Sequence, residues 1–155
     1  MKWKLYAAWI LFVETVGALS GWLTREGTKR YSEALVQPPL SPPAIVFPIV
    51  WGILFALMGI SAARVCLAPR SRARTRGLWL FFLQLAFNFF WSFLFFQFQA
   101  FGGALIWLLV LWALILGMIF AFHRVDPPAA WLQLPYLFWV TFAAYLNFGV
   151  WQLNR

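Results

Sequence analysis

Hydrophobic residues fall in five long runs that are separated by short polar or proline-rich stretches. The runs cover Leu5–Leu23, Ala44–Leu67, Leu78–Ala100, Gly102–Phe122 and Ala129–Leu153. Each is close to the roughly 20 residues that an α-helix needs to cross a bilayer. Strands of a membrane barrel are about half as long and alternate polar with apolar residues, which these runs do not. The pattern predicts an all-α integral membrane protein, a five-transmembrane-helix bundle in a single domain over residues 1–155.

Composition supports this class, and the basic residues indicate an orientation. The chain is 64% hydrophobic and only 10% charged, which is too apolar for one water-soluble core. The amino end with the second and fourth loops holds eight basic residues; the other side holds four, Arg25, Lys29, Arg30 and Arg155. The positive-inside rule therefore predicts a cytoplasmic amino end. We expect a bacterial cell membrane, with the outer membrane of a bacterium or a mitochondrion as the alternative, and no nucleic-acid partner.

Residues typical of catalytic chemistry are scarce. A single cysteine, Cys66, excludes an internal disulfide and any multi-cysteine metal site. His123 stands beside Arg124 at the end of a span, which favours an interfacial residue over a haem ligand. The sequence contains no recognisable nucleophile, metal cluster or acid–base pair, so we expect no metal, no required cofactor and no dedicated catalytic residue.

The first run admits two interpretations. Lys2, Lys4 and the apolar stretch after them are typical of a cleavable signal peptide, but the run continues to Leu23, which favours a retained helix. Glu14 lies near its middle and shares one face with the small residues Gly17, Ala18 and Gly21. Because small residues let another helix approach, Glu14 should point into protein, either as a functional acid or as a protonated group hydrogen-bonded to a neighbouring helix.

The loop over residues 24–43 is the longest and is rich in proline. Pro38, Pro39, Pro42 and Pro43 prevent a regular helix before Ala44 and pre-set several φ angles, so the segment loses little entropy when it becomes ordered. Its apolar residues predict that it folds back over the bundle as a lid above a cavity. A rigid connector without a ligand role is the alternative.

Two spans combine a proline with an aromatic stripe. One face of the second span carries Phe47, Trp51, Phe55 and Met58. One face of the fifth carries Tyr136, Trp139, Ala143, Leu146 and Asn147. Pro48 and Pro135 are expected to bend these helices beside Trp51 and Trp139, which predicts two walls of an aromatic slot. Asp126-Pro127-Pro128 predicts the start of the fifth helix, with Asp126 as its cap.

The third span carries the most informative polar pattern. Its positions i, i+4, i+7 and i+11 are Gln84, Asn88, Trp91 and Phe95, which share one helical face. Amides facing lipid would be unsatisfied, so this face should point to the interior. Asn88 either joins helices or offers a hydrogen bond to a bound molecule. The fourth span, which lacks amides and charges, is interpreted as lipid-facing.

Four segments along the chain together resemble a known family. They are Tyr31-x3-Leu35-x-Gln37-Pro38-x3-Pro42-Pro43, then VFPIVW ending at Trp51, then Leu85-x2-Asn88-x2-Trp91 with Phe95 and Phe96, and finally PYLFWVTFAAYLN from Pro135 to Asn147 with Trp151. They resemble the TspO/MBR family of tryptophan-rich sensory proteins and translocator proteins, the peripheral benzodiazepine receptors. The resemblance covers nearly the whole chain in the same order.

The resemblance implies a five-helix bundle, commonly a homodimer, with a pocket among the helices beneath the first long loop. The implied ligands are tetrapyrroles such as porphyrin and haem, cholesterol-like sterols, and synthetic isoquinoline carboxamides and benzodiazepines. By position, Trp51 and Trp139 are the pocket tryptophans, and Tyr31 and Pro42 lie on the lid. The other candidate ligand-binding residues are Asn88, Trp91, Ala143, Phe47, Phe55, Leu146 and Asn147.

The chain departs from the family pattern at several positions. Tyr31-Ser32 replaces a frequent Trp-Tyr, and Leu40 replaces a frequent Trp. Gln37 replaces a frequent lid lysine, which predicts weaker binding of anionic ligands. Phe148 stands where animal members have the tyrosine of a sterol-associated stretch, and Arg155 lies several residues beyond it, which argues against cholesterol binding.

Flat conjugated rings bind well between aromatic faces, because large apolar areas are buried and offset stacking adds about 1 kcal/mol per pair. The first hypothesis is therefore a membrane receptor or sensor that binds tetrapyrroles and affects their handling or stress signalling. The second is an enzyme that degrades porphyrin with light and oxygen, with Trp51 and Trp139 as redox partners. The third is a small tetrapyrrole or sterol transporter, for which the sequence shows neither an internal repeat nor a set of intramembrane charges.

Overall fold

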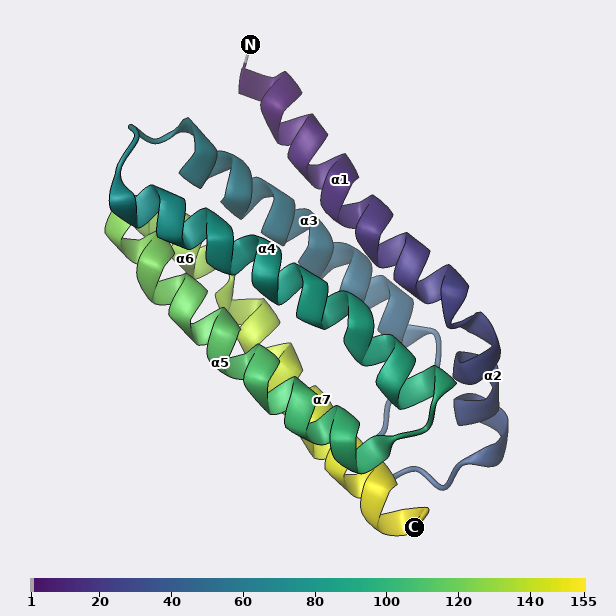
Figure 1. Cartoon of the computed structure of the whole chain (residues 1–155). Coiled ribbons are helices and arrows are strands. Elements are labelled where there is room, and N and C mark those ends of the chain that lie inside the picture. The colour runs from purple at the N-terminus through teal and green to yellow at the C-terminus, as the bar shows by residue number, and fades with distance from the viewer. Residues whose placement is uncertain (1) are drawn as a thin grey trace.

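The computed structural model describes residues 2–155, which form helices joined by short connections (Figure 1). In chain order these are α1 (Lys2–Leu23), α2 (Arg25–Ala34), α3 (Val46–Leu67), α4 (Arg72–Ser92), the π-helical segment η1 (Phe93–Gln97), α5 (Phe101–Val125), α6 (Pro127–Leu132) and α7 (Leu134–Leu153). Within the described range, five helical stretches are long and apolar enough to cross a membrane. The predicted all-α bundle of five transmembrane helices is confirmed.

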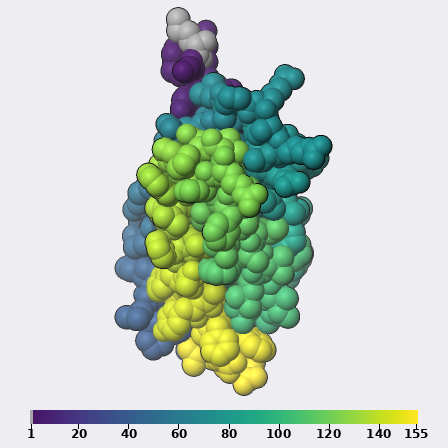
Figure 2. Space-filling model, turned by 90° about the vertical axis from the view of Figure 1, so that its left-hand side faces the viewer, coloured from purple at the N-terminus to yellow at the C-terminus, as the bar shows by residue number. Residues whose placement is uncertain are grey.

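The helices form an elongated bundle with the two ends of the chain at opposite ends of it (Figure 1). α1 packs along α3, α4 along α5, and α5 also along α7. Figure 2 shows α5 and α7 side by side on one face, with the segment between α3 and α4 projecting at one end. The short helix α2 lies at the other end (Figure 1). Because the chain runs along the bundle an odd number of times, it begins at one end of the bundle and finishes at the other.

α5 has a buried face, which corrects its interpretation as a lipid-facing helix. Its inward residues, which are almost fully buried, are Ala104, Leu108, Leu111, Ile115, Met118 and Phe122. The opposite side exposes Ile106, Leu109 and Phe120. Because residues 101–122 of α5 include no charged or amide side chain, composition could not distinguish the face toward protein from the face toward lipid. The helix is a central packing element between α4 and α7.

The expected proline bends are absent from α3 and α7 because both prolines lie in a first turn. α3 begins at Val46, so Pro48 occupies a position whose N–H has no partner within the helix. The last span is divided instead: α6 ends at Leu132, and α7 begins at Leu134 with Pro135 in its first turn. The last span is thus interrupted at Gln133, two residues before Pro135.

Asp126 begins α6 as predicted, but its carboxylate does not cap the helix. Its two oxygens accept hydrogen bonds from Nε and Nη2 of Arg64 on α3, at 2.6 and 3.2 Å. Ser61 on α3 also donates to the carbonyl of Ala129, at 2.7 Å. These contacts join α3 to α6 at the end of the bundle far from α2 (Figure 1).

The first half of the predicted loop 24–43 is a helix, which corrects the sequence interpretation. Residues Arg25–Ala34 form α2, and its buried residues Gly27 and Tyr31 are four positions apart on one face. The proline-rich second half, 35–45, is not helical, as the four prolines require. Residues 24–45 are therefore a short helix followed by a strap.

α1 approaches α3 closely in one half and separates from it in the other. A Cβ atom added at Gly59 would lie 2.6 Å from Cα of Ile10, so the two helix backbones nearly touch there. At Gly21 on α1 and Gly52 on α3, an added Cβ would meet nothing within 4 Å. Gly59 is thus a site of close helix packing between α3 and α1, and Gly17 on α1 leaves room for the Phe55 ring of α3.

Candidate functional site

The space between the separated halves of α1 and α3 is part of an internal cavity of about 610 Å³. This volume falls in the range of roughly 300–1,000 Å³ that is usual for small-molecule sites. Ten of the eleven candidate ligand-binding residues line it: Tyr31, Phe47, Trp51, Phe55, Asn88, Trp91, Trp139, Ala143, Leu146 and Asn147. The eleventh, Pro42, lies on the strap and does not line the cavity. The residues that line it come from α1, α2, α3, α4, η1 and α7, with Thr24 between α1 and α2 and Ala44 on the strap.

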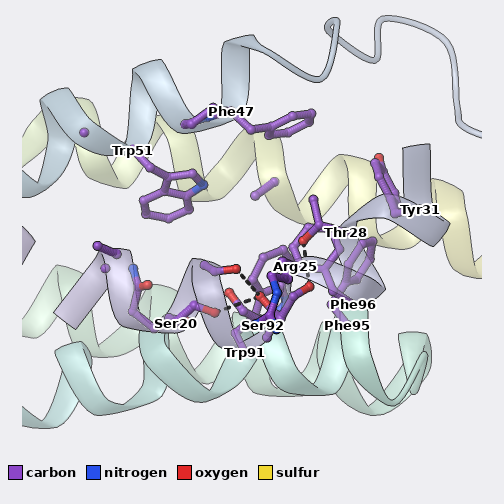
Figure 3. Close-up of a pocket in the computed structure, with 18 of the residues that line it drawn as sticks. Ser20, Arg25, Thr28, Tyr31, Phe47, Trp51, Trp91, Ser92, Phe95 and Phe96 are labelled. Atoms are coloured by element: carbon purple, nitrogen blue, oxygen red, sulfur yellow. Dashed lines mark hydrogen bonds between the residues drawn. The ribbon is translucent and has the colours of Figure 1, made fainter. Parts of the chain in front are cut away.

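Aromatic rings line the cavity on two sides, from α3 on one side and from α4 with η1 on the other (Figure 3). Trp51 stacks on Phe55 with ring centroids 5.3 Å apart, which holds its indole against α3. Phe47 meets Trp139 of α7 edge to face at 6.1 Å, so these two rings connect the two helices. At the α2 end, Trp91 stacks on Phe95 at 5.0 Å. These contacts leave flat apolar surfaces facing the cavity, which suits a planar ligand.

Trp139 presents a hydrogen-bond donor without a partner. Its Nε1 atom is buried and, within residues 2–155, has no acceptor in reach. A buried indole N–H without a partner costs about 1–3 kcal/mol of free energy, and because this atom has almost no accessible surface, a ligand acceptor would reach it only if the indole turned. By contrast, Trp91 Nε1 donates to Asn147 Oδ1 at 3.1 Å and is already satisfied.

Buried amide side chains join α7 to α4 and to α5. Tyr136 donates its hydroxyl hydrogen to Gln84 Oε1 at 2.7 Å and accepts from Asn88 Nδ2 at 2.8 Å. Asn147 Nδ2 donates to the carbonyl of Phe101 at 2.8 Å. The predicted interior face of α4 is therefore confirmed, and Asn88 joins helices through its Nδ2 atom while lining the cavity.

Tyr136→Phe is expected to lower the free energy of unfolding by about 1–2 kcal/mol, because Gln84 and Asn88 would each lose a buried partner. The matched control is Tyr145→Phe, whose hydroxyl donates to the carbonyl of Pro39 from an exposed position. Thermal unfolding of both variants in detergent measures the difference. Equal losses would show that the Tyr136 network adds nothing beyond a surface hydrogen bond.

α2 and the strap are fixed to the bundle from both sides. Gly27 N donates to Gln97 Oε1 at 3.2 Å, and a side chain at Gly27 would collide with the carbonyl of Phe96. On the strap, the backbone of Val36 exchanges two hydrogen bonds with the Asn154 side chain. Tyr31 packs among Phe47, Phe95 and Phe96, and its burial raises the pKa of its phenol.

The rest of the cavity lining comes mainly from α1 and the start of α2. Glu14 and Gly17 line the cavity, in agreement with the prediction that this face of α1 points into the protein. Sequence reasoning missed Ser20, Thr24, Arg25, Thr28 and Ser92. Continuing the helical face of Glu14 past Leu23 would have found Thr24, Arg25 and Thr28, had α2 been recognised as a helix. Ala18 and Gly21 line the cavity and are exposed, so it opens between α1 and α3.

Five apolar spans around an internal aromatic cavity define a multi-pass integral membrane protein with a small-molecule site among its helices. Comparison with known proteins narrows this class. The TspO/MBR family matches residues 9–152, and the chain belongs to this family, which includes tryptophan-rich sensory proteins and translocator proteins.

Similar proteins occur in bacteria and animals. The tryptophan-rich protein TspO of Chlorobaculum tepidum is 40% identical over 90% of this chain and 89% of its own. Protein CrtK of Rhodobacter capsulatus is 34% identical over 99% of this chain and 95% of its own. The translocator protein of Bos taurus is 34% identical over 99% of this chain and 92% of its own.

Proposed function

We propose that this protein is a membrane receptor that binds tetrapyrroles and related flat hydrophobic molecules in the cavity under α2 and the strap. In this proposal it resides in a bacterial cell membrane and acts as a sensor of these molecules or in their handling. The ligand ring lies between Trp51 and Trp139, which come from α3 and α7.

The observation that carries the proposal is the aromatic cavity. Its volume of about 610 Å³ admits a planar polycyclic ligand, and Trp51 with Phe47 offers ring faces to stack on it. Such faces suit a flat conjugated ring better than a hydrocarbon chain, because offset stacking adds about 1 kcal/mol per pair.

The proposal is tested by titrating the purified protein with protoporphyrin IX and following tryptophan fluorescence. Ala143→Trp places an indole inside the cavity and is expected to weaken binding about tenfold or more, because the ring plane loses its space. Ala113→Trp, the same change on the exposed face of α5, is the control and should bind as the wild type does. Absence of binding by the wild-type protein, or equal binding by both variants, would contradict the proposal.

Illumination of the same samples distinguishes a receptor from the porphyrin-degrading enzyme. The observation that favours an enzyme is that Trp51 and Trp139, the residues implied as redox partners, line one cavity. A receptor leaves the porphyrin absorption spectrum unchanged in air and light beyond the loss seen with free porphyrin. An enzyme converts the pigment to a new product, and conversion stops when both tryptophans are replaced.

A further inference from the structure

The cavity has charged groups at two separate levels of α1 and α2. Among residues 2–155, Arg25 is the single basic side chain that lines it, and Glu14 is the single acidic one. They are 11 positions apart on nearly continuous helix, which corresponds to about 16 Å at 1.5 Å per residue. A ligand in the cavity therefore meets a positive charge only at the α2 end of the cavity.

Hydroxyl groups near Arg25 are already used by the helix backbone. Thr24 Oγ1 donates to the carbonyl of Ser20 at 2.8 Å, and Thr28 Oγ1 donates to the carbonyl of Thr24 at 3.0 Å. Ser20 Oγ donates to the carbonyl of Phe89 on α4 at 3.0 Å. Figure 3 marks hydrogen bonds between the drawn lining residues as dashed lines on this side of the cavity, beside Ser20 and Thr28. The hydrogens of these three hydroxyls are therefore not offered to a ligand.

Arg25 keeps most of its donors. A guanidinium group has five N–H donors, and the structure gives Arg25 one hydrogen bond within the described chain, from Nη1 to the carbonyl of Trp22 at 2.7 Å. Its guanidinium carbon lies 4.2 Å from the Trp22 ring centroid, a cation–π contact that holds the head group in place. The other arginines near α2 differ: Arg30 donates to the carbonyl of Gln97 and does not line the cavity.

The geometry points to Arg25 as the residue that selects ligands with a carboxylate on one edge of a flat apolar body. This inference rests on the proposed function. The apolar body packs against Trp51 and Phe47 on the opposite side of the cavity, while the carboxylate meets Arg25 at the α2 end (Figure 3). A carboxylate can accept two parallel hydrogen bonds from a guanidinium group, so the pairing is directional as well as electrostatic.

This assignment revises one expectation from the sequence. Gln37 stands where many family members have lysine, which predicted weaker binding of anions. Gln37 donates to the carbonyl of Tyr31 at 3.3 Å and does not line the cavity. The positive charge beside the cavity comes from the first residue of α2 instead, a helix that the sequence interpretation had assigned to a loop.

The test compares protoporphyrin IX with its dimethyl ester, which has the same ring but no free carboxylate. For the wild-type protein we expect the acid to bind more tightly than the ester, and the advantage to shrink at high salt. Arg25→Gln should reduce the acid-to-ester affinity ratio by about fivefold, a modest change because the site is open to water. Arg25→Lys, which keeps the charge, should retain part of the ratio.

Lys29→Gln removes a nearby exposed charge that does not line the cavity and should leave the ratio unchanged. If Arg25→Gln weakens acid and ester equally, or if Lys29→Gln lowers the ratio as much, Arg25 does not select carboxylates. That result would leave the proposed function intact, because both probes would still bind. Failure of both probes to bind the wild-type protein would overturn the proposed function, and the role of Arg25 with it.

Discussion

Replacement of both Trp51 and Trp139 by alanine is expected to weaken binding of protoporphyrin IX by roughly 30- to 1,000-fold. Both indoles line the cavity, and each is supported by a second ring, Phe55 for Trp51 and Phe47 for Trp139. Stacking and apolar burial contribute about 1–2 kcal/mol for each ring. Since 1.4 kcal/mol corresponds to a tenfold change in affinity, the two losses together give this range. Equilibrium titration by porphyrin absorbance measures it without relying on tryptophan emission.

Two further variants separate the ring faces from the indole donors. Changing both residues to phenylalanine keeps aromatic faces but removes both N–H groups, including the unpartnered Nε1 of Trp139, so a smaller loss of about tenfold is expected. The control pair, Trp79→Ala with Trp131→Ala, removes two tryptophans that are 72% and 60% exposed outside the cavity. If this control loses as much affinity as the cavity pair, porphyrin binds to the outer surface and the site is wrong.

The sequence predicts the spans well because membrane insertion demands long apolar runs. The helix boundaries inside the last span are harder to predict, since a proline is found both at a kink within a helix and in the first turn of a new helix. Pro135 fits a kink inside a helix and equally the first turn of a new one, and in the structure it lies in the first turn of α7. The π-helical turn at η1 has no sequence signal, yet it ends α4 at the cavity.

Face counting along the spans predicts most of the cavity. Asn88 lines it because an amide in a membrane helix must turn toward protein, and Trp51 and Trp139 line it on the aromatic faces counted along α3 and α7. The α1–α2 side was harder to predict. Arg25–Ala34 contains good helix formers and no proline, but the prolines that follow suggested a loop for the whole connection. Arg25 was therefore treated as a loop charge rather than as a residue on the face of Glu14.

Gly59→Leu is expected to lower the free energy of unfolding by about 3 kcal/mol or more. A side chain at this position would collide with the backbone of Ile10, at its Cα and N atoms, so relief requires α1 as a whole to move from α3. Overpacking that a rotamer change can relieve typically costs 1–3 kcal/mol, and displacement of a backbone costs more. Thermal unfolding in detergent should show a lower midpoint, with weaker porphyrin binding because α1 forms one side of the cavity.

Gly52→Leu is the matched control, because it makes the same substitution on the same helix. An added Cβ at Gly52 meets nothing within 4 Å, and Gly52 lines the cavity where α1 and α3 separate. Leucine also favours helix more than glycine does, by roughly 0.5–1 kcal/mol, so stability should not fall. The new side chain stands in the opening between α1 and α3, and stopped-flow fluorescence should show slower association of porphyrin. A Gly52→Leu protein as unstable as Gly59→Leu would mean that the two helices do not separate there, and the opening would have to lie elsewhere.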